Sequence, residues 1–176
     1  MKTFKKLFLL MMVAGLLFSC TDDEFQAIKI SNPEPEIVTG PFEAVFTGNY
    51  MDGCEIGGIT YVRIEFTGTS VQLGNLTGYL EFPEGPGDAQ GHIVTANGDV
   101  LYISCQHKVK VGREPNHPKH VISYWRDPFV ILGGTGQFEG ATGNGMTDDY
   151  NSCEDENSHH RWRGMITLIK GDTKKQ

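Results

Sequence analysis

Two patterns of apolar residues divide the chain. Residues 7–18 form an unbroken apolar run behind the basic residues Lys2, Lys5 and Lys6, whereas apolar and polar residues alternate with a period of two after Gly40. An alternation with period two is typical of strands that bury one face. The sequence therefore predicts a short apolar leader followed by an all-β domain.

The alternating part of the chain contains about eight candidate strands. In the last of them, Trp162, Ile166 and Leu168 fall on one face, and Arg161 and Arg163 fall on the other. The predicted strands are 42–47, 61–66, 76–82, 91–96, 100–107, 120–132, 137–148 and 161–169. Eight short antiparallel strands suggest a sandwich or a closed barrel, and closure would remove the exposed sheet edges.

The leader has the features of a bacterial export signal. Its apolar run of twelve residues is shorter than the roughly twenty that a helix needs to cross a bilayer, so it predicts a signal that is removed. The segment Leu17-Phe18-Ser19-Cys20 resembles the bacterial lipobox, in which a peptidase cuts before a lipid-modified cysteine. This resemblance implies a signal peptide at 1–19 and a membrane anchor on Cys20.

Residues 20–40 show neither a helical nor a strand periodicity and contain Pro33 and Pro35, which predicts a flexible tether. The tract Thr21-Asp22-Asp23-Glu24 resembles the one that directs Bacteroidetes lipoproteins to the cell surface, but a solvated start to a linker explains it equally well. We expect an outer-membrane lipoprotein, with exposure at the cell surface left open. The predicted organisation is a signal at 1–19, a tether at 20–40, a barrel domain at 41–170 and a polar tail at 171–176.

One glycine-rich segment carries a family resemblance. It reads Gly133-Gly134-Thr135-Gly136-Gln137-Phe138-Glu139-Gly140-Ala141-Thr142-Gly143 and resembles the G-G-T-G-x-F-x-G-A-x-G signature of allene oxide cyclase and dirigent-like (calycin-like) barrels and their bacterial lipoprotein relatives. The resemblance implies a closed antiparallel eight-stranded β-barrel, which we expect to be an up-and-down meander. It carries over no catalytic residue, because those of the plant cyclases match no positions here. The glycines themselves predict a tight turn, with Phe138 plugging the barrel beside it.

A meander would place the long connections at one end of the barrel and the short ones at the other. The long-loop end holds 51–58, 83–90, 108–119 and 149–160, and the short-turn end holds 68–74, 97–99 and 133–136. Binding groups usually lie on loops of a rigid scaffold, so the long-loop end is the candidate site. Its predicted ligand-binding residues are His92, His107, His120, His159, His160 and Asp148. No spacing places two metal ligands on one element, so neither a metal nor a cofactor is predicted.

The cysteines test this topology. Cys105 alternates with Leu101 and Ile103 and is predicted to be a buried free thiol. Cys54 follows the first strand and Cys153 precedes the last, and these strands are neighbours in a closed barrel. We therefore predict a disulfide between Cys54 and Cys153, with reduced surface thiols as the alternative.

Charge and motif content narrow the function. Loss of the leader takes the formal charge from −7 to −10, which opposes binding to nucleic acid. No G-x-S-x-G elbow or other catalytic spacing occurs. Two classes remain: a binding module for a small apolar molecule, a glycan or a protein, which we favour, and a cyclase-like or isomerase-like enzyme with a barrel pocket. A cavity with an inward polar residue such as His107 would favour the enzyme or a ligand carrier.

Overall fold

The computed structural model describes residues 34–56 and 58–171, without the side chains of residues 52, 54 and 56. The predicted signal peptide, the lipid site Cys20 and most of the predicted tether and tail lie outside the described residues. The strands are β1 (Glu36–Ile56), β2 (Ile59–Ser70), β3 (Gly74–Pro83), β4 (Ala89–Thr95), β5 (Val100–Cys105), β6 (Lys110–Val111), β7 (Val121–Trp125), β8 (Pro128–Gly134), β9 (Thr142–Ser152) and β10 (Ser158–Lys170).

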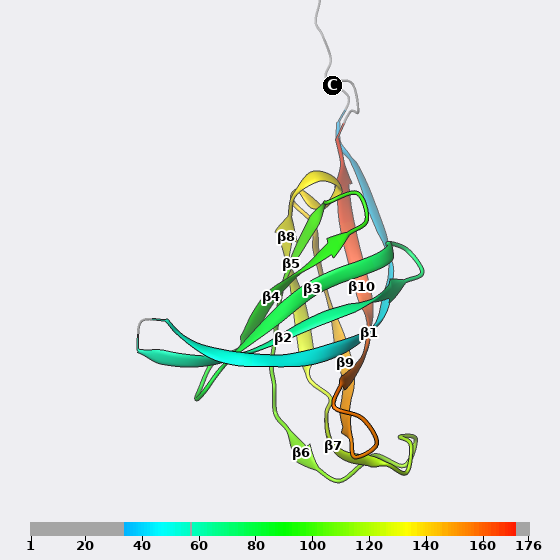
Figure 1. Cartoon of the computed structure of the whole chain (residues 1–176). Coiled ribbons are helices and arrows are strands. Elements are labelled where there is room, and N and C mark those ends of the chain that lie inside the picture. The colour runs from blue at the N-terminus through cyan, green and yellow to red at the C-terminus, as the bar shows by residue number, and fades with distance from the viewer. Residues whose placement is uncertain (1–33, 57, 172–176) are drawn as a thin grey trace, which may run out of the picture. The chain divides into compact units, whose positions relative to one another are not determined.

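The strands pair into a ring of eight (Figure 1). The order is β10-β1-β2-β3-β4-β5-β8-β9, all antiparallel, and β9 pairs with β10, so the ladder returns to its start. Neighbours in space are neighbours along the chain, except that β6 and β7 are inserted between β5 and β8. The all-β prediction is confirmed, and the eight ring strands have the predicted sequential order.

Helical structure in the described residues is limited to η1 (Gly136–Phe138), a single 3-10 turn between β8 and β9. Within the same residues, no helix has the length and apolar character needed to span a bilayer.

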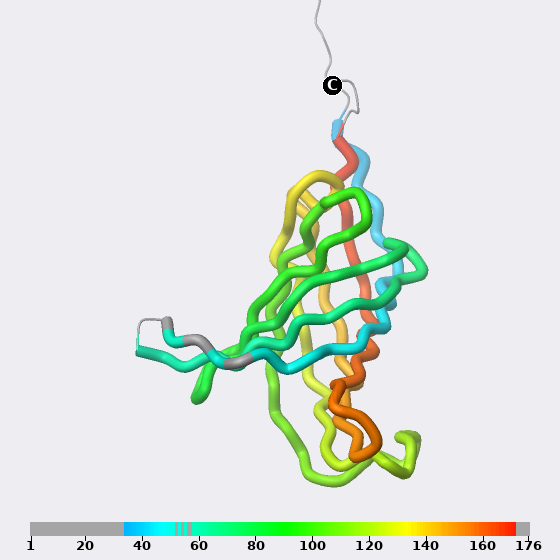
Figure 2. The backbone as a smooth tube through the Cα atoms, in the orientation of Figure 1, coloured from blue at the N-terminus to red at the C-terminus, as the bar shows by residue number. Residues whose placement is uncertain are grey.

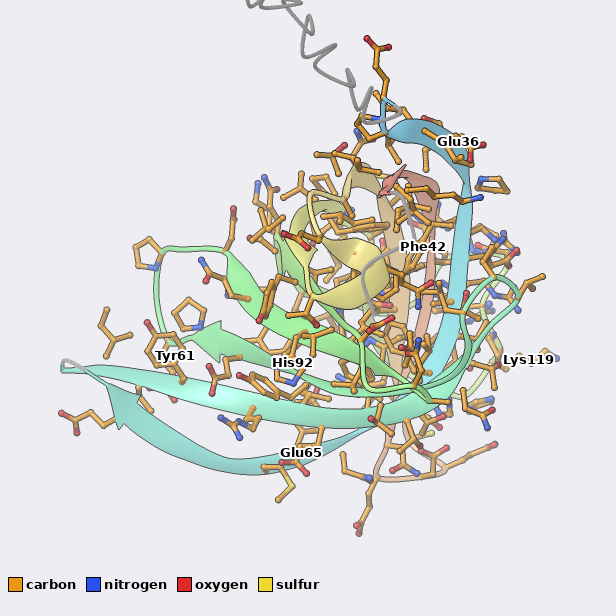
Figure 3. The ribbon with its side chains drawn as sticks, turned by 90° about the horizontal axis from the view of Figure 1, so that it is seen from above. Glu36, Phe42, Tyr61, Glu65, His92 and Lys119 are labelled. Atoms are coloured by element: carbon orange, nitrogen blue, oxygen red, sulfur yellow. The ribbon has the colours of Figure 1, made fainter. Side chains whose placement is uncertain are left out.

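The buried face of the ring carries one hydrophobic core. Alternation along each strand turns side chains such as Phe42 into this core and side chains such as Glu65 to the outside, as Figure 3 shows in a view turned by 90°. Every ring strand except β9 contributes to the core, together with the turn before β9; the core consists of Phe42, Ala44, Phe46, Phe66, Leu76, Leu80, Ala89, Ile93, Leu101, Ile103, Cys105, Phe129, Ile131, Phe138, Ala141, Trp162 and Ile166. Burial of these apolar surfaces is the main force that holds the ring together.

The glycine-rich segment forms the turn that its sequence predicts. Gly136 has φ +56°, a left-handed conformation that glycine adopts without strain. Gly134 packs against the carbonyl oxygen of Val100, and an added Cβ there would lie only 2.6 Å from the Cβ of Phe138. Phe138 is fully buried in the core, as predicted.

The predicted strand 42–47 is too short at both of its ends. β1 begins at Glu36 and continues to Ile56, so residues 36–40 belong to the sheet rather than to the tether, and residues 51–56 are strand rather than loop. The reason is that 36–40 pair with β10, while 51–56 pair with β2 in a hairpin. An alternating pattern marks a strand with one buried face, but residues 36–40 are exposed or half-buried throughout, and residues 51, 53 and 55 are exposed.

The predicted strand 120–132 is in fact two strands. β7 and β8 both pair with β9, and Arg126 and Asp127 separate the two strands. The amide of Asp127 donates to the Thr147 hydroxyl, and the amide of Thr147 donates to the Asp127 carbonyl, which fixes the break against β9. β6 and β7 then extend beyond the ring as a hairpin arm, visible in Figure 2 as the green and yellow-green segment at the bottom.

The two ends of the ring differ, as the meander predicts. Connections 84–88, 106–120 and 153–157 lie at the long-loop end. The turns 71–73, 96–99 and 135–141 lie at the other end, where Glu36 of β1 also pairs with Lys170 of β10.

Candidate functional site

An apolar pocket of about 170 Å³ lies at the long-loop end of the ring. Inward side chains of β1, β2 and β3 form one wall, and the chain after β5 and the end of β7 form the other. The lining residues are Tyr50, Val62, Ile64, Phe82, His107, Val109 and Trp125. Aromatic and aliphatic side chains therefore supply most of its surface, with a few polar atoms among them.

Two of those polar groups are held in place by neighbours. The Tyr50 hydroxyl donates to Oδ1 of Asn151 at 3.2 Å, and Nδ2 of Asn151 donates to the Ser123 hydroxyl at 3.1 Å. Burial raises the pKa of Tyr50, so this hydroxyl keeps its proton at neutral pH. The His107 ring packs edge-on against Phe82, with centroids 5.5 Å apart. Predicted site residue His107 thus does lie at a pocket of the long-loop end.

A buried polar network lies behind Ile64 and Trp125. The Ser158 hydroxyl donates to the Gly48 carbonyl at 3.2 Å, and its oxygen lies 2.8 Å from Nε2 of His160. Since that hydroxyl donates its proton to Gly48, it accepts one from His160 Nε2–H. The close packing depends on Gly48, because a Cβ at this position would lie 2.7 Å from Ser158 Oγ.

Asp149 faces the other side of the His160 ring. Its Oδ1 lies 3.3 Å from His160 Nδ1, but the contact lacks hydrogen-bond geometry and leaves Nδ1 without a hydrogen-bond partner. The Trp162 indole N–H donates to both carboxyl oxygens of Asp149, at 3.1 and 3.3 Å. Complete burial raises the pKa of Asp149, and the opposing effects of His160 and Trp162 do not cancel that rise.

Ser158, His160 and Asp149 stand in the order of a hydrolase triad, but they are sealed in the core. Their exposed fractions are 0%, 2% and 1%. A nucleophile has to reach its substrate, and the hydroxyl of Ser158 is already engaged with Gly48. The network therefore joins β1, β9 and β10 inside the ring rather than presenting reactive groups.

A second group of side chains surrounds Tyr150 on the outer face of β9 and β10. The His159 ring stacks on Tyr150 at a centroid distance of 4.7 Å, and His117 and His120 approach the same ring at 5.6 and 6.4 Å. His120 also bonds to the Ser152 hydroxyl at 2.8 Å. The loop before β7 thereby folds back over the outer face of the sheet.

Asp148 fixes this loop to the sheet. Nδ1 of His117 accepts from the Glu114 amide at 3.2 Å, so its proton sits on Nε2, which donates to Asp148 Oδ1 at 3.0 Å. Arg126 donates to the same oxygen, also at 3.0 Å. Burial works to raise the pKa of Asp148, but the bonds from His117 and Arg126 outweigh it and hold this pKa below its ordinary value.

A polar groove of about 280 Å³ lies between this loop and the outer face of β1, β9 and β10. Its lining includes Val45, Phe46, Thr47, Asn116, His117, Pro118, Asp148, Tyr150, His159, His160 and Arg161. The register explains this set, since Thr47, His159 and Tyr150 lie side by side across the three strands, as do Val45, Arg161 and Asp148.

The structure brings together only part of the predicted rim. His120, His159 and Asp148 gather around Tyr150, and His107 lies at the apolar pocket. His160 follows the parity of Trp162 and is buried, although it also borders the polar groove. His92 lies apart from the other predicted residues, on the outer wall of β4 against Tyr79, with ring centroids 4.2 Å apart.

The predicted disulfide is not formed. Cys153 is an exposed free thiol, and Cys105 is a buried free thiol, as predicted. The side chain of Cys54 lies outside the described residues, but its backbone pairs with Tyr61 in the hairpin of β1 and β2. Pairing of β1 with β10 ends at Gly48 and Ser158, and the β1–β2 hairpin then leaves the ring in a different direction from the β9–β10 loop (Figure 1).

Sequence reasoning missed Asp149, Ser158 and Tyr150. It also missed that His117 anchors the loop before β7 to the sheet through Asp148. For His160 the signal was present, since residues 160, 162 and 166 share one strand face. For Asp149 there was none, because an inward carboxylate looks the same in sequence as a solvated one. Among the described residues, no three His, Cys, Asp or Glu side chains converge as metal ligands.

Comparisons with known proteins give distant structural likenesses. No family model matches the chain, and no curated protein matches it. The solved structure of the pterocarpan synthase dirigent protein GePTS1 is similar at 15% identity and a TM-score of 0.49, covering 77% of this chain and 93% of that one. The pterocarpan synthase dirigent protein PsPTS1 is similar at 12% identity and a TM-score of 0.42, covering 79% and 99%.

Proposed function

We propose that the eight-stranded ring is a closed barrel that acts as a binding module, and that its long-loop end takes a small apolar molecule. The observation that carries this proposal is the pocket between Val62, Phe82 and Trp125, whose walls are mainly aromatic and aliphatic. Pockets for small molecules are typically concave and apolar with a few fixed polar groups, and here Tyr50 and His107 supply such groups.

The size of the pocket limits the ligand. An apolar cavity of about 150 Å³ binds benzene, so a pocket of about 170 Å³ suits one aromatic or alicyclic ring. Drug-sized ligands occupy about 300 Å³ or more, so a larger molecule would insert only one ring. A hydroxyl on that ring could bond to Tyr50 or His107, which favours a phenol over a plain hydrocarbon.

A single-ring phenol tests this proposal. We expect 4-methylphenol to bind with a dissociation constant of about 1 mM, since eight non-hydrogen atoms at about 0.5 kcal/mol each give about 4 kcal/mol. In Val62→Trp the indole fills the pocket, and binding followed by NMR should be lost. Val130→Trp is the matched control, because Val130 is 44% exposed and faces outward on β8. Equal binding by Val62→Trp and the parent protein would refute the pocket as the site.

The apolar pocket offers few groups that could act in catalysis. A cyclase or isomerase needs an acid or base that touches its substrate, and the pocket offers only Tyr50 and His107. The network of Ser158, His160 and Asp149 is sealed from it. We therefore favour binding over catalysis.

We also propose that the chain is anchored in the outer membrane through a lipid on Cys20. Its support is the sequence alone: the leader and the resemblance of residues 17–20 to the lipobox. Expressed in a bacterium, the chain should fractionate with membranes and gain the mass of a diacylglyceryl group, and Cys20→Ser should lose both properties. Membrane association without any mass change would contradict the proposal.

A further inference from the structure

We propose that the polar groove between residues 116–118 and the outer face of β1, β9 and β10 is a second binding site, and that its ligand is a small polyhydroxy carboxylate bound through Arg161. The groove lies on the outside of the ring, whereas the apolar pocket is lined by inward side chains. The two sites share no lining residue.

The carboxylates in and beside the groove already have partners. Asp148 accepts from His117 and Arg126, both at 3.0 Å. Asp155 accepts from His159 at 3.1 Å and from the Asn157 amide at 2.8 Å. Paired in this way, the two acidic groups offer little attraction to a cation, which argues against a metal or an amine as the ligand.

Arg161 is the exception among the charged groups of the groove. It is exposed on β10 between Val45 of β1 and Asp148 of β9, yet no acidic residue of the described part of the chain forms an ion pair with it. Asp148, its neighbour across the ladder, is bonded to Arg126 instead. A planar guanidinium with several N–H donors matches a carboxylate in a bidentate geometry.

The remaining lining suits a ligand with hydroxyl groups. Thr47 and Asn116 offer a hydroxyl and an amide, and the stacked rings of Tyr150 and His159 offer a flat wall. A volume of about 280 Å³ equals that of about nine water molecules at about 30 Å³ each, which is the room that one sugar ring with a carboxyl group needs. Carboxylate, hydroxyls and ring size together describe a sugar acid.

Calorimetric titration of the purified protein with D-glucuronate tests the proposal, with D-glucose and inorganic phosphate as comparison probes. We expect glucuronate to bind, glucose to bind at least tenfold more weakly because it lacks the carboxylate, and phosphate to bind more weakly because it lacks the ring. Added salt should weaken glucuronate binding, since the site is exposed.

Four substitutions test whether glucuronate binds in the groove. Arg161→Gln should weaken glucuronate binding about tenfold, which corresponds to about 1.4 kcal/mol. Arg163→Gln is the matched control, because Arg163 lies two residues along the same outer face but is already paired with Glu43 at 3.0 Å. Thr47→Val, which removes only a hydroxyl, should cause a smaller loss, and Val62→Trp should cause none.

Three results would overturn the proposal. These are no glucuronate binding by the parent protein at 50 mM ligand, equal losses in Arg161→Gln and Arg163→Gln, and phosphate binding as tight as glucuronate binding. Failure of 4-methylphenol to bind would bear on the apolar pocket alone, because that pocket shares no lining residue with the groove that contains Arg161.

Discussion

Asp149→Asn and Asp149→Leu are expected to change the free energy of unfolding by very different amounts. Asparagine keeps the shape of a protonated aspartate: its oxygen can accept from the Trp162 indole N–H, and its amide can donate to His160 Nδ1, which has no hydrogen-bond partner in the native chain. We therefore expect Asp149→Asn to stay within about 1 kcal/mol of the parent protein at pH 7.

Leucine has a similar size but no polar atoms. In Asp149→Leu, both Trp162 Nε1 and His160 Nδ1 face an apolar side chain inside the core. Each buried polar group left without a partner costs about 1–3 kcal/mol, so the two together should cost about 2–6 kcal/mol. The contrast between the variants isolates the polar contacts from side-chain volume.

The pH dependence follows from the raised pKa of Asp149. Because burial makes the folded state take up this proton more readily than the unfolded state, the contribution of Asp149 to stability is present below its ordinary pKa and is lost as the pH rises through the folded value. Asparagine does not titrate. The stability of the parent protein relative to Asp149→Asn should therefore fall as the pH rises from 4 to 8.

Urea unfolding at several pH values measures these differences, with Glu65→Gln as the control for an exposed carboxylate on β2. That control should change stability by less than about 0.5 kcal/mol. The reasoning fails if Asp149→Asn is as unstable as Asp149→Leu at pH 7. Such a result would mean that Asp149 is ionised in the core and is held there by a doubly protonated His160.

Three other predictions concern the turn, the loop and the thiols. Phe138→Ala empties the space beneath the glycine-rich turn and should cost about 3–5 kcal/mol in urea unfolding. Asp148→Asn should cost about 1 kcal/mol at pH 7, and this difference should shrink as the pH falls through the lowered pKa of Asp148, because its contribution is present above the ordinary pKa and lost below the folded value. Cys153 should react with iodoacetamide in the folded protein, whereas Cys105 should react only on unfolding, since burial raises its thiol pKa far above the usual range.

Each of these has its own control or contrary outcome. Val71→Ala serves for the turn, because Val71 is 87% exposed and should change stability by less than about 0.5 kcal/mol. A cost for Asp148→Asn that is the same at pH 7 and pH 3 would show that the carboxylate does not hold the loop through its charge. Alkylation of Cys105 at the rate of Cys153, read by mass spectrometry, would contradict its burial.

The fold could be predicted because alternation survives along the ring strands. Phe42, Ala44 and Phe46 on β1, like Trp162 and Ile166 on β10, mark the buried face directly. The hairpin arm at 106–125 could not be predicted in the same way. This arm extends beyond the ring, so the buried face of the ring does not impose an alternation along its strands. The interruption between β7 and β8 is fixed by the hydrogen bond from the Asp127 amide to the Thr147 hydroxyl.

The candidate site was predicted at the level of its position and not of its residues. Loop length pointed to the long-loop end, where both His107 and the group around Tyr150 lie. Placing His159 and His160 together was wrong, since neighbours along a strand face opposite sides of a sheet. The partnership of Asp149 with His160 needed the register of β9 against β10, which depends on pairings distant in sequence.

The pairing of Glu36 with Lys170 puts the entry and exit of the domain side by side, away from the long loops. A circular permutant that joins these residues through a short linker and opens the turn 71–73 would therefore keep every ring ladder. A fluorescent or affinity tag fused directly before Glu36 or after Lys170 would start at the end of the ring opposite both cavities, which makes this edge suitable for immobilising the domain on a sensor surface.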